Sequence, residues 1–222
     1  MAATKPELER RRVYMIMTRL LIARHGNTFG PNEIVRRVGK TDLSLSESGL
    51  LQGRALGNYL KNNLLVPNVI FTSSLKRTQQ TANEAQKTMK TSLSLQPLTI
   101  FNEVDYGVDE NQPEEKVVAR LGRDALMAWE KEAKVPLGWR VNPDEIVNNW
   151  YEFGNMIIKH YLGQIILVVT SNGIARFAPY LTGNFPEFIT NHSIKIATGC
   201  FSIFQHQNYR EHWDCLGWNL KP

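Results

Sequence analysis

The stretch 20-LLIARHGNT-28 decides the fold of this chain. Its first four residues are all apolar, which is typical of a parallel strand that helices cover on both faces. A cation and an imidazole follow at once, in Arg24 and His25. A second stretch, 164-QIILVVTSNG-173, has the same form, because an apolar run ends in small polar residues. The two stretches predict that polar groups gather at the carboxyl edge of one sheet.

Strands and helices alternate along the rest of the chain. Apolar residues at three- and four-residue steps indicate the helices, and Ser46 is a suitable N-cap for the first of them. This alternation predicts an α/β fold, a three-layer sandwich with a mostly parallel central sheet flanked by helices. We expect strands over 18–24, 68–72, 93–101, 164–170, 194–205 and 212–217, and helices over 46–62, 75–90, from Pro143 onward and after Gly173.

The chain of 222 residues suits one domain of medium size. We expect an N-terminal tail at 1–16 and a single domain at 17–222. A charged, helical segment at about 107–160 is interpreted as a helical cap insertion. Its recurring aromatic residues are assigned to core packing rather than to a cofactor.

Composition narrows the classes of function. Hydrophobic residues make up 42% of the chain and charged residues 21%, which is typical of a globular domain. No apolar run approaches the roughly 18 residues of a membrane helix, so we expect no membrane partner. The net charge of +5 is too small to indicate nucleic acid and suits an acidic small molecule. The basic N-terminus lacks the apolar core of a secretory signal.

The two cysteines, Cys200 and Cys215, are too few for a disulfide scaffold. We interpret both as reduced thiols of a cytoplasmic protein. Neither CxxC nor HExxH occurs, so we expect no metal site, and nothing in the sequence indicates a cofactor. The sequence leaves a homodimer open.

Three of the expected strands end in groups that suit a phosphate. The first ends in Arg24 and His25, the second is followed by Arg77 in the first turn of a helix, and a later one ends in 170-TSNG-173 at another helix start. Helix starts and arginine forks both bind phosphate oxygens. A histidine among them can attack phosphorus. These features predict a phosphate pocket.

Together these motifs resemble those of the histidine phosphatase superfamily, with its phosphoglycerate-mutase-like fold. The resemblance covers essentially all of 17–222, the cap being the least typical part, and favours the phosphatase branch. The matching stretches are 20–28, 39-GKTDLSLSESGLLQG-53, 71-FTSSLKRTQQTA-82, 102-NEVDYG-107 and 168-VVTSNGIAR-176.

The resemblance implies a role for each residue of these motifs. It makes His25 the residue that becomes phosphorylated, and Arg24 and Arg77 the residues that hold the phosphoryl group. Glu103 stands where the family places its general acid, and Asp105 is the nearby alternative. Further residues expected at the phosphate or substrate are Thr28, Arg36, Asn172 and Gly173.

Asn172 departs from the family pattern, which has a histidine before the glycine. Asparagine keeps a hydrogen-bond donor but cannot carry a charge. Losing one hydrogen-bond donor to a transition state typically lowers the rate by about 10²–10³-fold. Because asparagine keeps a donor, we expect the rate to fall by a factor near or below the lower end of this range. His192, Lys40 and Arg176 are cations that could fill the gap. We expect surface or packing roles for His160, His206 and His212.

Three functions remain open. The first is a phosphomonoesterase that hydrolyses a small phosphate ester, such as a sugar phosphate, through a phosphohistidine at His25. The second is a phosphate-ligand binder whose turnover is weakened or lost because of Asn172. A phosphoglycerate-type mutase is disfavoured, because Val104 replaces the arginine of the mutase motif and the cap is acidic. Its carboxylates are Asp105, Asp109, Glu110, Glu114 and Glu115.

Overall fold

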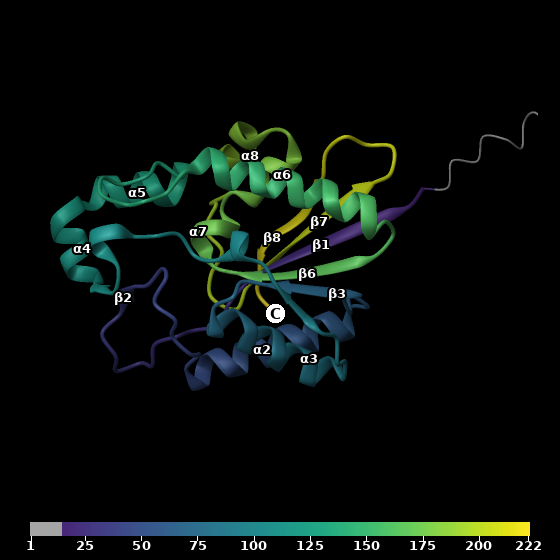
Figure 1. Ribbon diagram of the computed structural model, residues 1–222, viewed down its shortest axis with the longest axis horizontal. Coiled ribbons are helices and arrows are strands. Elements are labelled where there is room, and N and C mark those ends of the chain that lie inside the picture. The colour runs from purple at the N-terminus through teal and green to yellow at the C-terminus, as the bar shows by residue number, and fades with distance from the viewer. Residues whose placement is uncertain (1–14) are drawn as a thin grey trace, which may run out of the picture.

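The computed structural model describes residues 15–222, and these form a central sheet between two layers of helices (Figure 1). The sheet has six strands in the order β4-β3-β6-β1-β7-β8. The pairs from β4 to β1 are parallel, whereas β7 is antiparallel to β1 and to β8. The expected α/β fold with a mostly parallel sheet is therefore confirmed. The strands are β1 (Met17–Arg24), β3 (Val69–Thr72), β4 (Leu95–Pro97), β6 (Ile165–Thr170), β7 (Phe201–Gln207) and β8 (Asp214–Leu220).

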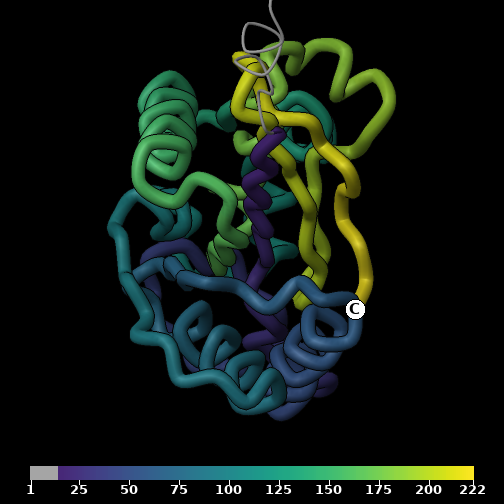
Figure 2. The backbone as a smooth tube through the Cα atoms, turned by 90° about the vertical axis from the view of Figure 1, so that its right-hand side faces the viewer, coloured from purple at the N-terminus to yellow at the C-terminus, as the bar shows by residue number. Residues whose placement is uncertain are grey.

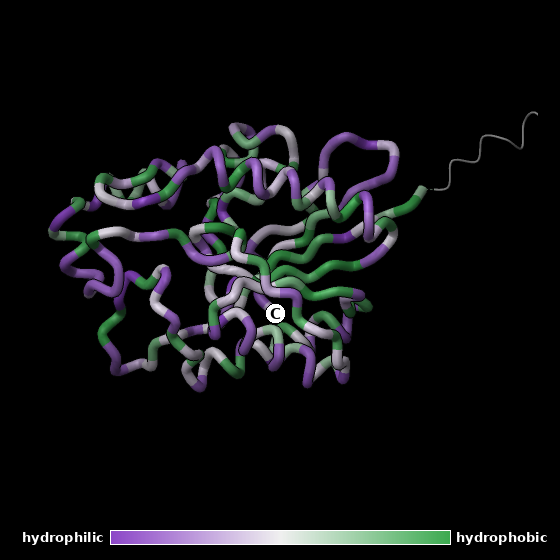
Figure 3. Tube along the Cα trace, in the orientation of Figure 1, coloured by the Kyte–Doolittle hydropathy of each residue, from purple (hydrophilic) through white to green (hydrophobic). Residues whose placement is uncertain are grey.

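Strand β1 shows why the apolar run at 20–23 is continuous. Side chains alternate across a strand, so Leu20 and Ile22 belong to the hydrophobic cluster on one face of the sheet, and Leu21 and Ala23 to the cluster on the other. All four are fully buried. The apolar strands lie together in the middle of the molecule (Figure 3). Burial on both faces is what removes the polar alternation from the sequence.

Helices α2 and α3 cover one face of the sheet, and α6, α7 and α8 lie on the other, as the turned view also shows (Figure 2). The Ser46 hydroxyl caps α2, as predicted, by accepting a hydrogen bond from the Gly49 N–H at 3.3 Å. The helices of these layers are α2 (Glu47–Asn62), α3 (Lys76–Met89), α6 (Pro143–His160), α7 (Asn172–Ala175) and α8 (Phe185–Asn191).

The cap lies at the end of the sheet where β1 and β6 stop. It contains α4 (Glu114–Leu121), α5 (Arg123–Glu132) and a small ladder of β2 (Arg36–Arg37) with β5 (Gln112–Pro113). Between residues 15 and 222 there are also three short 3-10 helices, η2 (Thr99–Phe101), η3 (Gly107–Asp109) and η4 (Ala178–Thr182).

Helix α6, which we expected inside the cap at 107–160, is instead part of a layer on the sheet. The Phe153 ring meets the Phe71 ring of β3 edge-on, with 5.1 Å between the centroids. Trp150 and Ile157 are buried in the same cluster. The aromatic stripe is therefore core packing, and the part of the insertion that stands away from the sheet ends before Pro143.

Three expected strands have the wrong bounds. The one expected at 212–217 is β8 (Asp214–Leu220), which begins two residues later and ends three residues later. The one expected at 93–101 has only three paired residues, because the chain turns into η2. The one expected at 194–205 begins at Phe201. Before it, the N–H groups of Ile196 and Ala197 donate to side-chain oxygens of Asn172 and Asn219 rather than to a strand, and Gly199 has a φ of +74°. Buried isoleucines made this loop resemble a strand in the sequence.

The other expectations concern the tail, the membrane and the cysteines. Most of the predicted tail, residues 1–14, lies outside the described residues. Within 15–222, no helix is long and apolar enough to cross a membrane. Cys200 and Cys215 are both free thiols. No cluster of metal-ligating side chains occurs in the same range.

Candidate active site

A cavity of about 420 Å³ opens between the cap and the carboxyl ends of β1 and β6. The structure brings five of the predicted residues to its wall from four separate stretches of chain: Arg24, His25, Arg77, Glu103 and Asn172. Thr28 and Arg36 also line it. Gly173 and Asp105 do not.

His25 follows β1 directly and is 7% exposed. Its Nδ1 lies 2.7 Å from the carbonyl oxygen of Gly26. A carbonyl only accepts hydrogen bonds, so Nδ1 carries the proton and Nε2 has the free lone pair in the neutral ring. Burial, and then the positive charges of Arg77 and Arg24, hold the pKa of His25 well below its usual range. The imidazole is therefore neutral at pH 7, as a nucleophile must be.

Gly26 lets the chain leave β1 close to the start of α2. A Cβ built on this glycine would lie 2.4 Å from the carbonyl oxygen of Gly49, which is backbone and cannot rotate away. The Gly26 N–H donates to the Thr81 hydroxyl of α3 at 3.0 Å. These contacts fix the position of the His25 ring relative to both helices.

Arg24 and Arg77 flank the imidazole without any carboxylate partner among the described residues. Arg24 donates from Nη1 to the Ile196 carbonyl at 2.8 Å. Arg77 is 1% exposed and donates to the carbonyls of Gly39 and Thr41 at 2.7 and 2.9 Å. Burial lowers the pKa of both guanidinium groups, which nevertheless remain charged at neutral pH. Glu103 attracts both guanidinium groups but forms an ion pair with neither, and a cation shielded from water without an ion-pair partner is costly, so the two arginines are suited to receive an anion.

The two helix starts that we expected to bind phosphate are occupied by carboxylates. At α3, the Lys76 N–H donates to Asp42 at 2.7 Å. At α7, the Gly173 N–H donates to Oε2 of Glu103 at 3.2 Å. The anion-binding capacity of the cavity therefore comes from side chains rather than from these backbone groups.

Glu103 is 8% exposed, and its other oxygen, Oε1, accepts from the Val104 N–H at 2.9 Å. Gly173 makes room for it, because a Cβ there would lie 2.1 Å from Oε1. Asp105, the alternative acid, points elsewhere: it pairs with Lys40 at 2.7 Å and with Arg140 at 3.7 Å. Of the two carboxylates, only Glu103 borders the cavity.

Asn172 is held in one orientation. Its Oδ1 accepts from the Ile196 N–H at 2.9 Å, and because a backbone N–H can only donate, the amide oxygen must lie on that side. Its Nδ2 has no partner among the described residues and is left as a neutral donor at the wall of the cavity.

Three cations were proposed to supply the charge that Asn172 lacks, and the structure places them differently. His192 is exposed and packs against the Phe188 ring, with 4.8 Å between the centroids. Lys40 is paired with Asp105. Only Arg176 lines the cavity.

The lining residues that the sequence did not predict include Arg37, Tyr106 and Lys195. Arg37, not its exposed neighbour Arg36, is the inner member of the pair, because side chains alternate along β2. Its guanidinium lies 5.5 Å from the Tyr106 ring centroid and pairs with Glu114. Burial raises the pKa of Tyr106. The sequence signal for Arg37 was an Arg-Arg dipeptide, which does not say which arginine points inward.

Residues 20–221 match the family described as histidine phosphatase superfamily (branch 1), and the chain belongs to this superfamily. A 2,3-bisphosphoglycerate-dependent phosphoglycerate mutase of Clavibacter michiganensis is 31% identical over 118 residues, which is 53% of this chain and 47% of the relative. The corresponding mutase of Bifidobacterium longum is 26% identical, over 81% of this chain and 71% of the relative. The match thus spans about half the length of the first of these relatives.

Solved structures with the same fold include phosphatases. A mycobacterial glucosyl-3-phosphoglycerate phosphatase superposes with a TM-score of 0.72 at 19% identity, covering 91% of this chain and 99% of that one. A phosphoserine phosphatase from Entamoeba histolytica gives a TM-score of 0.69 at 17% identity, with 92% and 98% covered. At these identities the likeness establishes the fold alone.

Proposed function

We propose that the protein is a phosphomonoesterase that works through a phosphohistidine at His25. The observation that supports this most directly is the hydrogen bond from Nδ1 of His25 to the Gly26 carbonyl. It leaves Nε2 as the nucleophilic nitrogen in a cavity that also holds two arginines without counter-ions. A neutral imidazole beside bare guanidinium groups is an arrangement for attack on a phosphate ester.

The reaction has two transfers. Nε2 of His25 forms a bond to phosphorus while the ester P–O bond breaks, and Glu103 gives a proton to the departing alkoxide. A water then attacks phosphorus, Glu103 accepts its proton, and the P–N bond breaks to release phosphate and the neutral imidazole. Arg24 and Arg77 stabilise the charge on the equatorial oxygens in both steps.

The substrate is proposed to be a small phosphate ester, which suits a cavity of about 420 Å³. Two relatives of the same fold are named for esters of this kind, one for glucosyl-3-phosphoglycerate and one for phosphoserine. The sequence suggested that the carboxylates of the cap would repel a highly charged substrate. The structure weakens this argument. Four of the cap's five carboxylates have partners: Asp105 pairs with Lys40, Asp109 with Arg120 and Glu114 with Arg37, and Glu110 accepts from the backbone N–H groups of Gly39 and Thr41.

The test combines turnover with chemical trapping. We expect hydrolysis of p-nitrophenyl phosphate and, after a brief incubation with labelled substrate, an acid-labile and alkali-stable label on His25. The change His25→Ala should abolish both, whereas His192→Ala, at an exposed histidine outside the cavity, should change neither. A label on another residue, or turnover that survives His25→Ala, would disprove the proposal.

A second candidate is a binder with little or no turnover, and the neutral amide of Asn172 is the observation that favours it. In that case the parent protein binds orthovanadate but does not hydrolyse the aryl phosphate, and Asn172→His raises turnover sharply. Movement of phosphate between the hydroxyls of 3-phosphoglycerate would instead indicate a mutase.

A further inference from the structure

Arg176 is a buried cation that the reaction described above does not use. It follows α7, is 2% exposed, and lines the cavity. Its Cζ lies 4.0 Å from the centroid of the Trp129 ring. Nε donates to the Asn172 carbonyl at 3.2 Å and Nη1 donates to the Trp129 carbonyl. The second terminal nitrogen, Nη2, has no hydrogen-bond partner within residues 15–222.

The cations around the cavity fall into two groups. Arg37 pairs with Glu114, and Lys195 pairs with Glu130 at 3.2 Å, whereas Arg36 is exposed to solvent. Arg176 forms no ion pair in the described part of the chain, and in this it resembles Arg77, which is also buried, and Arg24, which is half-buried. Burial lowers the pKa of Arg176 to about 10, against the opposing effects of Tyr106 and Glu103, so it remains charged at neutral pH.

A buried charge without a counter-ion is strongly unfavourable unless something compensates it. Trp129 provides part of the compensation, because a guanidinium over an indole face gains roughly 0.5–2 kcal/mol. Two backbone carbonyls provide more. Glu103 and Glu130 attract the guanidinium, but neither forms an ion pair with it. Nη2 therefore remains free to donate a hydrogen bond to an anion in the cavity.

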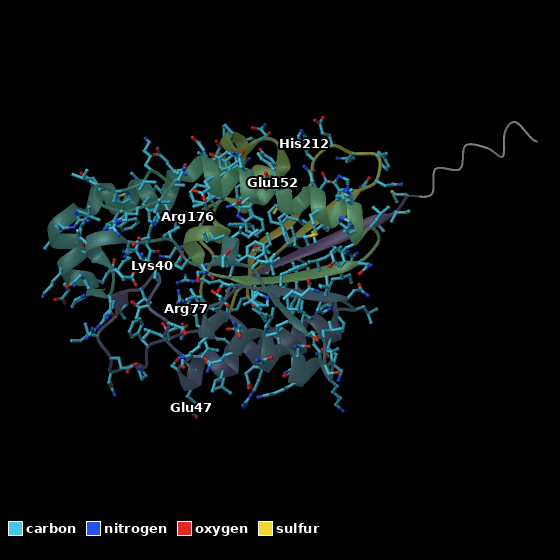
Figure 4. The ribbon with its side chains drawn as sticks, viewed as in Figure 1. Lys40, Glu47, Arg77, Glu152, Arg176 and His212 are labelled. Carbon is cyan, nitrogen blue, oxygen red and sulfur yellow. The ribbon has the colours of Figure 1, made fainter. Side chains whose placement is uncertain are left out.

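The three bare guanidinium groups reach the cavity from different layers of the fold. Arg77 comes from α3 on one side of the sheet, Arg24 from the end of β1, and Arg176 from the chain after α7 on the opposite side. Figure 4 shows Arg77 and Arg176 at the same end of the sheet. Arg176 also donates a hydrogen bond to the backbone carbonyl of Asn172. The free amide donor of Asn172 lies at the wall of the same cavity.

We propose that Arg176 is a third guanidinium ligand of the transferring phosphoryl group and supplies the positive charge that Asn172 cannot. This assignment rests on the proposed phosphatase function. Asn172 provides a neutral donor, and Arg176 a charged one. A charge-assisted hydrogen bond is roughly twice as strong as a neutral one, so the pair together replaces what a protonated histidine at position 172 would do alone.

The first test is the change Arg176→Gln, with Arg176→Lys as the charge-preserving variant. We expect Arg176→Gln to lower kcat/KM for p-nitrophenyl phosphate and the affinity for orthovanadate by about 10²-fold. Arg176→Lys should restore about a tenth of the parent value, because an ammonium keeps the charge but not the fork. The control is Arg140→Gln, at an exposed arginine of the cap, which should leave both quantities unchanged. Vanadate affinity within threefold of the parent in Arg176→Gln would overturn the assignment.

The second test is a double-mutant cycle with Asn172→His. In the parent we expect little gain, since an imidazolium there would be repelled by the guanidinium already present. In the Arg176→Gln background the same change should raise kcat/KM by about tenfold or more, which is a coupling that a purely structural arginine would not produce. An equal effect of Asn172→His in both backgrounds would contradict the proposal.

Two complications are covered by the same variants. If Arg176→Gln does not fold, the cycle is run with Arg176→Lys, where vanadate affinity equal to that of the parent would overturn the assignment. If the parent hydrolyses no ester, the phosphatase proposal fails, yet orthovanadate and inorganic phosphate affinities still test Arg176. A labelled His25 together with an unaffected Arg176→Gln would refute this inference alone.

Discussion

The two walls of the cavity differ in what their cations bind: backbone carbonyls on the sheet side and carboxylates on the cap side. On the sheet side, Arg24, Arg77 and Arg176 donate only to backbone carbonyls. On the cap side, two lining cations are paired with lining carboxylates, Arg37 with Glu114 and Lys195 with Glu130. Two further ion pairs of the cap, Arg120 with Asp109 and Lys40 with Asp105, lie behind this wall and do not line the cavity.

The difference shows where an anion gains most. Carbonyl oxygens orient a guanidinium without cancelling its charge, so the sheet side keeps a positive field directed at the cavity. Paired ions attract one another and project little field beyond their neighbours. We therefore expect substitutions on the sheet side to change catalysis, and substitutions on the cap side to change stability or substrate affinity.

The largest difference between the two sides is expected when one arginine of each is neutralised. Arg77→Gln should lower kcat/KM for p-nitrophenyl phosphate by about 10²–10³-fold, because it removes a charged donor from the transition state. Arg120→Gln should leave kcat/KM within about threefold but lower the free energy of unfolding by about 1.5–3 kcal/mol, since Asp109 is buried and loses a charged partner. Urea titration with steady-state kinetics measures both effects, and a reversed pattern would refute the distinction.

A second test on the sheet side displaces the acid rather than a cation. In Gly173→Ala the new Cβ would lie 2.1 Å from Oε1 of Glu103, so the carboxylate must move. We expect kcat/KM to fall by about 10²-fold, the lower range for losing a general acid. Esters with a good leaving group need less acid help, so p-nitrophenyl phosphate should suffer less than an alkyl phosphate. Equal losses on both esters would indicate that Glu103 is not the acid.

Substitutions of the adjacent residues Arg36 and Arg37 test the cap side of the cavity. Arg37→Gln should raise KM by about tenfold with little change in kcat, because it removes affinity that is common to the ground state and the transition state. It would also leave Glu114 unpaired beside the cavity. Arg36→Gln should raise KM less than Arg37→Gln does, because Arg36 lines the cavity but is exposed to solvent. If Arg36 proves the more sensitive of the two, the placement of Arg37 is wrong.

The smallest effect concerns the pH dependence of stability. The pKa of His25 is depressed on folding, so the unfolded chain binds more protons below pH 6.5 and the free energy of unfolding rises with pH through that window. From about pH 5 to pH 7, the free energy of unfolding should rise more steeply for the parent than for His25→Asn. His206, whose pKa is also lowered, is present in both proteins and cancels in the difference. Parallel stability curves would show that the His25 pKa is not depressed.

Local patterns predicted a large part of the molecule. The apolar runs of β1 and β6 predicted a buried parallel sheet, because a strand covered on both faces is apolar at every position rather than at alternate ones. Ser46 and Pro143 predicted two helix starts, since capping depends on residues a few positions apart. The motifs around Arg24, Arg77, Glu103 and Asn172 led to one cavity because the carboxyl ends of parallel strands share an edge.

What the sequence could not decide was how each polar group is used once the chain is folded. Only the tertiary structure placed Asp42 and Glu103 at the starts of α3 and α7 and paired Asp105 with Lys40. It also left Arg36 exposed and Arg37 half-buried, although both line the cavity. It alone left Arg176 buried without a counter-ion. Hydrogen bonds and ion pairs depend on the positions of atoms that can be more than a hundred residues apart, and no local pattern carries that information.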